Sequence, residues 1–124
     1  MFRYDPTYNP EAAVVDVIVS NPFNSGIGSV NGRGKLDSGG CRTIIPESWS
    51  NRLGLVPTRT QNASGFNGST AQIFMAIVTI EFNGLTFRNV EVGIARRFDA
   101  CIGRDILNQL KVELDGRNLQ FGIV

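Results

Sequence analysis

The sequence predicts a mainly β protein with one or two short helices. Short runs of β-branched and aliphatic residues recur along the chain, Gly and Asn are frequent between them, and Asn-Gly and Asp-Gly pairs stand where two runs adjoin. A chain of 124 residues can bury a core as one domain. We therefore expect a single all-β unit.

The expected strands follow the apolar runs at residues 14–19, 73–80, 90–94 and 112–114. Asn83-Gly84 separates residues 78–82 from residues 85–87. Both central positions of a two-residue hairpin turn need positive φ, which Asn and Gly adopt readily. The sequence therefore predicts a tight hairpin at this pair.

A second hairpin is expected near the end of the chain. Asp115-Gly116 follows residues 112–114 and precedes the apolar residues 119–121. The turn is either the Asp-Gly pair alone or a longer loop that includes Arg117 and Asn118.

Two short helical segments are expected. Glu47–Leu53 follows a proline and ends before Gly54, and it places Trp49 and Leu53 on one face. Residues 104–110 carry apolar side chains at helical spacing just before the terminal hairpin. The second helix is expected to pack on the sheet.

The domain is expected to span residues 14–124, after a polar N-terminal arm at residues 1–13 that contains prolines. No basic and apolar leader precedes the domain, so the expected compartment is the cytoplasm. In a reducing cytosol, Cys41 and Cys101 are expected to be unbonded packing residues, with a disulfide or a zinc site as the alternative.

Composition argues against several function classes. The 12 Lys and Arg nearly balance 11 Asp and Glu, so nothing attracts nucleic acid or an anionic membrane, and an RNA-binding β-barrel is disfavoured. The chain has no histidine, which removes the usual base of serine and cysteine hydrolases. Residues 26–32 approach a dinucleotide-binding pattern, but the last spacing is wrong. No cofactor or metal is expected.

The first chemical signal is Leu36-Asp37-Ser38-Gly39, which is followed by Gly40 and by an apolar run. The two glycines allow a tight turn and let a peptide backbone approach the carboxylate closely. Taken alone, the segment is also typical of a strand end followed by an ordinary turn that has no catalytic role.

The second signal is the segment Ala-Cys-Ile-Gly-Arg-Asp-Ile-Leu at residues 100–107. With both signals in this order, the sequence resembles the retroviral-type, retropepsin-like aspartic proteases from about Val14 to the last residue. In that family an Asp-Thr/Ser-Gly loop precedes a flap hairpin, and an apolar-apolar-Gly-Arg-Asn/Asp-Leu-Leu segment follows. Ile45-Pro46 and Leu53-Gly54-Leu55 match the small non-viral cellular members.

The resemblance implies an acid-protease-like closed β-barrel with one lobe per chain, in a homodimer. It implies that Asp37 is catalytic, that Ser38 orients the acids across the dimer axis, and that Gly39 offers its carbonyl to the substrate. The substrate-binding residues expected on this basis are Gly39, Gly40, Ile45, Gly65, Phe66, Asn67, Gly68 and Ile102. Structural support of the acid loop is expected from Thr43, Gly103 and Arg104, and also from Ile102.

The segment at residues 64–69 stands where the family has the glycine-rich tip of the flap, and its lone aromatic, Phe66, is expected to fold over an apolar ligand. The alternative is an ordinary surface loop. The chain departs from the viral pattern at Cys41, where an Asp often pairs with the helix-opening arginine. Arg104 therefore needs another partner, for which Asp105, Asp99 or a carbonyl are candidates. The final strand is expected to pair either across the axis or in a local hairpin.

Peptide hydrolysis by carboxylates takes two acids that share a proton. None of the other aspartates stands in an Asp-Ser/Thr-Gly segment: Asp5, Asp16, Asp99, Asp105 and Asp115. A twofold axis that brings Asp37 of two chains together supplies the pair. The expected function is an aspartic endopeptidase acting on peptides or proteins, and the alternative is a catalytically silent dimeric binding module of the same fold.

Overall fold

The computed structural model describes residues 1–64 and 68–124, and this part of the chain is mainly β with short helices, as the sequence predicts. In chain order the elements are β1 (Phe2–Arg3), β2 (Val14–Ser20), the 3-10 helix η1 (Ser25–Ile27), β3 (Ser29–Leu36), β4 (Ile44–Pro46), α1 (Glu47–Leu53), β5 (Arg59–Ser64), β6 (Thr70–Phe82), β7 (Leu85–Ala95), β8 (Ala100–Ile102), α2 (Arg104–Leu107), β9 (Val112–Asp115) and β10 (Gln120–Ile123).

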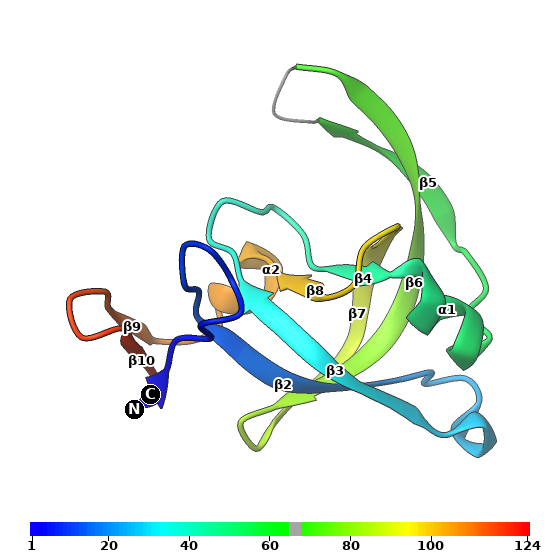
Figure 1. Ribbon diagram of the computed structural model, residues 1–124. Coiled ribbons are helices and arrows are strands. Elements are labelled where there is room, and N and C mark those ends of the chain that lie inside the picture. The colour runs from blue at the N-terminus through cyan, green and yellow to red at the C-terminus, as the bar shows by residue number, and fades with distance from the viewer. Residues whose placement is uncertain (65–67) are drawn as a thin grey trace.

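Six of these strands form a closed barrel in the order β2, β3, β8, β4, β7 and β6 (Figure 1). β2 pairs antiparallel with β3 on one side and with β6 on the other, which closes the ring. β8 pairs in parallel with β3, so Leu36 lies opposite Ile102. The segments that follow these two strands therefore leave the barrel at the same end, and they are the two segments that carry the sequence signals.

β5 lies outside the ring and pairs with the first half of β6, from Arg59↔Met75 to Ser64↔Thr70. This β5–β6 hairpin rises from the barrel and curves over the side on which residues 37–43 lie (Figure 1). The predicted hairpin between β6 and β7 is confirmed, because Asn83 and Gly84 both have positive φ, at 52° and 73°.

The two ends of the chain meet in a separate sheet with the strand order β1, β10 and β9 (Figure 1). Phe121 of β10 is fully buried, and its ring lies 5.3 Å from that of Phe2. The predicted terminal hairpin is confirmed, and of its two expected turns the longer loop with Arg117 and Asn118 is the one that forms, because Asp115 pairs with Gln120 and four residues lie between them. Asp115 accepts a hydrogen bond from Asn118 N at 3.2 Å, which stabilises this longer loop.

The first helix is confirmed and the second is shorter than predicted. In α1, Trp49 and Leu53 are buried, and Gly54 ends the helix in the left-handed conformation. α2 stops at Leu107 instead of residue 110. The hydrogen bonds after it join residues three apart, as from Gln109 N to the Ile106 carbonyl, so the chain continues as tight turns.

The core fills the barrel and extends to the inner face of α1. Its largest fully buried side chains are Phe121, Ile45, Leu53, Met75, Ile80, Ile102 and Ile106, together with Val17, Val19, Val30, Val78 and Val92. Alternate residues of β2 are buried, which fits one face of a strand packed against the core. None of the helices in the described ranges is long and apolar enough to cross a membrane.

Candidate active site

Asp37 follows β3 directly and begins a tight turn. Its backbone N–H donates to the Ile102 carbonyl at 2.9 Å, which extends the pairing of β3 with β8 into the loop. Gly40 N donates to the Asp37 carbonyl at 3.1 Å, and Gly39 N donates to Asp37 Oδ1 at 3.0 Å. The turn thus fixes the carboxylate at the end of the barrel, with one oxygen bound to the main chain of its own loop.

The start of α2 holds the other end of this loop. Arg104 N donates to the Gly40 carbonyl at 2.8 Å. A Cβ on Gly103 would lie 2.6 Å from the carbonyl carbon of Arg42, so the close approach of the two segments requires glycine at this position. The two sequence signals therefore form one unit in the structure.

Thr43 connects the loop to α2 through its side chain. The Thr43 hydroxyl donates to Asp105 Oδ1 at 2.8 Å and accepts from Gly103 N at 3.1 Å, while Thr43 N donates to Asp105 Oδ2 at 3.0 Å. Thr43 is completely buried. A buried network in which every group has a partner is rigid, so these bonds restrict the position of the acid loop.

Among the described residues, the Arg104 side chain binds none of the partners suggested by the sequence, which were Asp105, Asp99 and a carbonyl. Its side chain is exposed, and a guanidinium N–H donates to Cys41 Sγ at 3.1 Å. Asp105 points inward to Thr43, as described above, and Asp99 is bound by Arg97 at 2.8 Å. Cys41 is likewise exposed instead of packed in the core, whereas Cys101 is buried, and both thiols are free.

Asp99 directly precedes β8 and is nearly fully buried. The Tyr8 hydroxyl donates to Asp99 Oδ2 at 2.5 Å, and Arg97 Nη2 donates to Oδ1. Burial, together with the neighbouring Asp99 carboxylate, raises the pKa of the Tyr8 phenol. This contact attaches the N-terminal segment to the barrel.

A cavity of about 410 Å³ lies between the acid loop and the β5–β6 hairpin. It is lined by Gly39, Gly40, Cys41, Arg42, Ile44, Gln61, Asn62, Ala63, Ile73 and Met75. A Cβ on Gly93 would lie 2.5 Å from Ile44 Cδ1 and 2.7 Å from Ile73 Cδ1, so both isoleucines pack directly over the Gly93 backbone. They form an apolar floor beside the loop that carries Asp37.

The structure describes the predicted residues of the acid loop but only part of the predicted flap tip. Asp37, Ser38, Gly39 and Gly40 lie together in the acid loop, and Ser38 and Gly39 are exposed. Gly68 is exposed with φ 79°. Gly65, Phe66 and Asn67, which are also predicted to bind substrate, lie outside the described residues.

The structure corrects the substrate-binding assignments of Ile45 and Ile102. Both side chains belong to the buried core, with exposed fractions of 0% and 1%. Successive strand residues point to opposite faces, so Ile44 lines the cavity because Ile45 faces the core. Ile102 instead contributes its carbonyl to the hydrogen bond from Asp37 N.

Several lining residues were not identified from the sequence, among them Arg42, Ile44 and Met75. Ile44 and Ile45 are adjacent and face opposite sides of a strand, and because both are isoleucine the sequence does not indicate which of them faces the core. Gln61, Asn62 and Ile73 line the cavity because the β5–β6 hairpin bends back over the loop, which no local pattern encodes.

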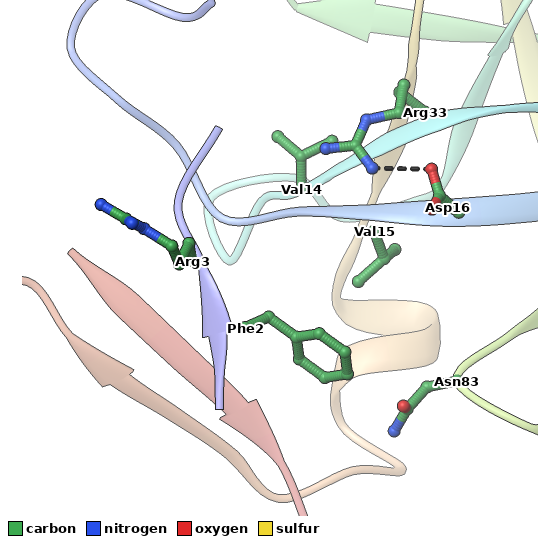
Figure 2. A pocket seen from close by; sticks show the side chains of 7 residues that line it. All are labelled: Phe2, Arg3, Val14, Val15, Asp16, Arg33 and Asn83. Carbon is green, nitrogen blue, oxygen red and sulfur yellow. Dashed lines mark hydrogen bonds and ion pairs between the residues drawn. The ribbon is translucent and has the colours of Figure 1, made fainter. Parts of the chain in front are cut away.

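A second hollow of about 310 Å³ lies between β1 and β2, and Figure 2 shows its lining. Phe2 and Val15 contribute apolar surface, and Arg33 forms an ion pair with Asp16 at 2.7 Å. This hollow shares no lining residue with the cavity beside Asp37. Within residues 1–64 and 68–124, no three His, Cys, Asp or Glu side chains gather in a group that could hold a metal ion.

Comparison with known families agrees with this geometry. The family model described as aspartyl protease matches residues 24–106, a range that contains the acid loop, the Thr43 network and the start of α2. The chain belongs to the aspartyl protease family. A comparison with curated proteins gave no significant match.

Solved structures place this aspartyl protease family member in the retropepsin-like fold. The chain is similar to the EIAV protease complexed with the inhibitor HBY-793, with a TM-score of 0.61 and 22% sequence identity. The similarity covers 82% of this chain and 91% of that one. The resemblance stated from the two sequence signals is confirmed at the level of family and fold.

Proposed function

We propose that this chain is an aspartic endopeptidase that acts as a homodimer, with Asp37 of each subunit forming the catalytic pair. The observation that carries the proposal is the acid loop itself. Its carboxylate is fixed at the end of the barrel, and a cavity with an apolar floor opens beside it. A peptide lying along this cavity brings a scissile carbonyl close to the carboxylate.

The chemistry requires a second acid, and the described chain provides one acid loop. In the pair, one carboxylate is ionised and takes a proton from a bound water, while the other is protonated and donates to the carbonyl oxygen. The water attacks the carbonyl to give a tetrahedral diol. As the diol collapses, the carboxyl that took the water proton donates it to the amide nitrogen, the other carboxylate takes a proton from a diol hydroxyl, and the C–N bond breaks to release an amine and a carboxylic acid. Two carboxyls within hydrogen-bond distance of each other share one proton, because two negative charges this close repel.

The exposed position of Ser38 supports a twofold arrangement. Its side chain stands next to Asp37 on the surface of the monomer, where a second copy of the loop can meet it. An isologous contact places identical residues opposite one another, so two Ser38 hydroxyls and two Asp37 carboxyls face each other at the axis. In this assembly the β5–β6 hairpin acts as the flap, covering the bound peptide.

The direct test compares the parent protein with Asp37→Asn on a mixed peptide library, with and without pepstatin. Asparagine keeps the shape of the side chain but cannot ionise, so cleavage by the variant is expected to fall at least about a thousandfold, the scale on which loss of an essential acid or base acts. Asp16→Asn, at an exposed carboxylate on β2, is the matched control and retains activity.

Mixed dimers test the shared site. Asp37→Asn subunits are added in increasing excess to a fixed amount of parent and allowed to exchange. Activity is expected to fall as mixed dimers replace parent dimers, because each mixed site has one ionisable acid. Unchanged activity at high excess contradicts a shared site. If parent and variant bind peptides equally and neither cleaves them, the protein is instead a silent binding module of the same fold.

A further inference from the structure

We propose that the cavity beside Asp37 selects peptides with an acidic side chain at the position that enters it, and this inference rests on the proposed function. The lining combines an apolar floor with a cationic edge and includes no acidic residue. A glutamate side chain matches both features, since its methylene groups cover apolar surface and its carboxylate reaches a cation.

The cation is Arg42, and its main chain is held firmly. The Arg42 carbonyl group packs against the Gly103 backbone, and the next peptide nitrogen, Thr43 N, donates to Asp105. The Arg42 side chain itself is 41% exposed and lines the cavity. A fixed backbone with an accessible guanidinium suits recognition of a carboxylate, because less freedom is lost on binding.

The charges around Arg42 leave it incompletely neutralised. Its one carboxylate neighbour within 4.0 Å among the described residues is Glu91, at 3.8 Å. Glu91 is already occupied by Arg59, which donates to both of its oxygens at 2.6 and 3.1 Å, and by the Thr58 hydroxyl at 3.2 Å. Two guanidinium groups therefore share one carboxylate, which leaves one excess positive charge, and Arg42 belongs to the cavity lining.

Neighbouring groups add to this preference. Arg104 brings a second cation to the same loop, and its partner is the Cys41 sulfur, not a carboxylate. Gln61 lines the opposite wall, and its Oε1 accepts from Arg59 at 3.0 Å, so the side-chain group that remains for a ligand is the amide NH2, a donor. A substrate carboxylate in the cavity thus meets donors on both walls, whereas a lysine side chain meets like charge.

The test uses peptides that carry Glu, Gln or Lys at each position near the scissile bond in turn. The parent is expected to prefer Glu over Gln by about tenfold in kcat/KM at the position that enters the cavity, the scale of one charge-assisted hydrogen bond. Arg42→Gln is expected to remove this preference, and Arg42→Glu to favour Lys. Arg88→Gln, an exposed arginine on β7 toward the Asn83-Gly84 turn, is the matched control and keeps the parent preference.

Binding of the same peptides to Asp37→Asn, with and without Arg42→Gln, is also measured by fluorescence titration. The charge selection can therefore be tested without turnover. If the parent does not cleave the peptides but binding still favours Glu, the result contradicts the proposed function and leaves the charge selection intact. Cleavage with equal rates for Glu and Gln at every position, or a Glu preference that survives in Arg42→Gln, overturns the charge selection. Salt is expected to weaken the preference, because the Arg42 guanidinium is exposed.

Discussion

Replacing Thr43 with valine tests the link between the acid loop and α2. Valine has nearly the shape of threonine, so the completely buried site stays filled while the hydroxyl is removed. Two hydrogen bonds disappear, the one that the hydroxyl donates to Asp105 Oδ1 and the one that it accepts from Gly103 N. The perturbation is therefore confined to polar contacts between the two sequence signals.

The magnitude follows from what each former partner keeps. Asp105 Oδ1 still accepts from Ile106 N at 3.0 Å, and Oδ2 still accepts from Thr43 N. The buried Gly103 N–H loses its partner. A lost hydrogen bond to a carboxylate and an unsatisfied buried N–H each cost between about 1 and 3 kcal/mol, so Thr43→Val is expected to lower the free energy of unfolding by about 2–6 kcal/mol.

The assay is urea unfolding followed by the fluorescence of Trp49, the single tryptophan of the chain, which is buried in α1. Thr43→Ser is the matched control. It keeps the hydroxyl and loses one methyl group, which costs about 1 kcal/mol. All variants are compared at one protein concentration, since dimerisation couples stability to concentration. The reasoning is refuted if the valine variant is as stable as the serine variant.

Two further predictions concern ionisable side chains. Tyr8→Phe is expected to lower the free energy of unfolding by about 1.5–3 kcal/mol, because it removes the hydrogen bond to the buried Asp99 carboxylate. Folding raises the pKa of Tyr8 above its ordinary value of 10.0, so this bond is fully present below pH 10.0 and is lost as the phenol ionises. The late phase of phenolate absorbance should vanish in the variant; its persistence contradicts the assignment. The hydrogen bond from Arg59 lowers the pKa of Glu91 below 4.5, so its contribution to stability is complete above pH 4.5 and is lost as the pH falls through the lowered value. Glu91→Gln should therefore flatten the acid limb of a stability profile, and parallel acid limbs would refute this.

Features that depend on local geometry could be predicted from the sequence. Asn83-Gly84 gave a correct hairpin because a two-residue turn needs positive φ at both positions, whatever surrounds it. Glu47–Leu53 was correct because its proline, its apolar spacing and Gly54 all lie within one short segment. At Asp115-Gly116 the local signals left two turns open, and the hydrogen bonds from Asn118 to Asp115 stabilise the longer one.

The partners of charged and apolar side chains depended on contacts between distant segments. Arg104 binds Cys41 because Asp105 turns inward to Thr43, more than sixty residues away in the chain. Ile44 and Ile45 lie on opposite faces of β4, and the packing of β4 between β7 and β8 decided which of the two faces the core.

The sequence by itself determined the acid loop and the segment that supports it, because these follow from residue chemistry and from turns of a few residues. Tertiary structure alone decided how the two signals join, which isoleucine faces the cavity, and that Arg42 stands at its edge beside an already occupied Glu91. The reason is physical. Closing the barrel brings β3, β8 and the β5–β6 hairpin together, and the neighbours that set burial and charge balance come from that closure and from no local pattern.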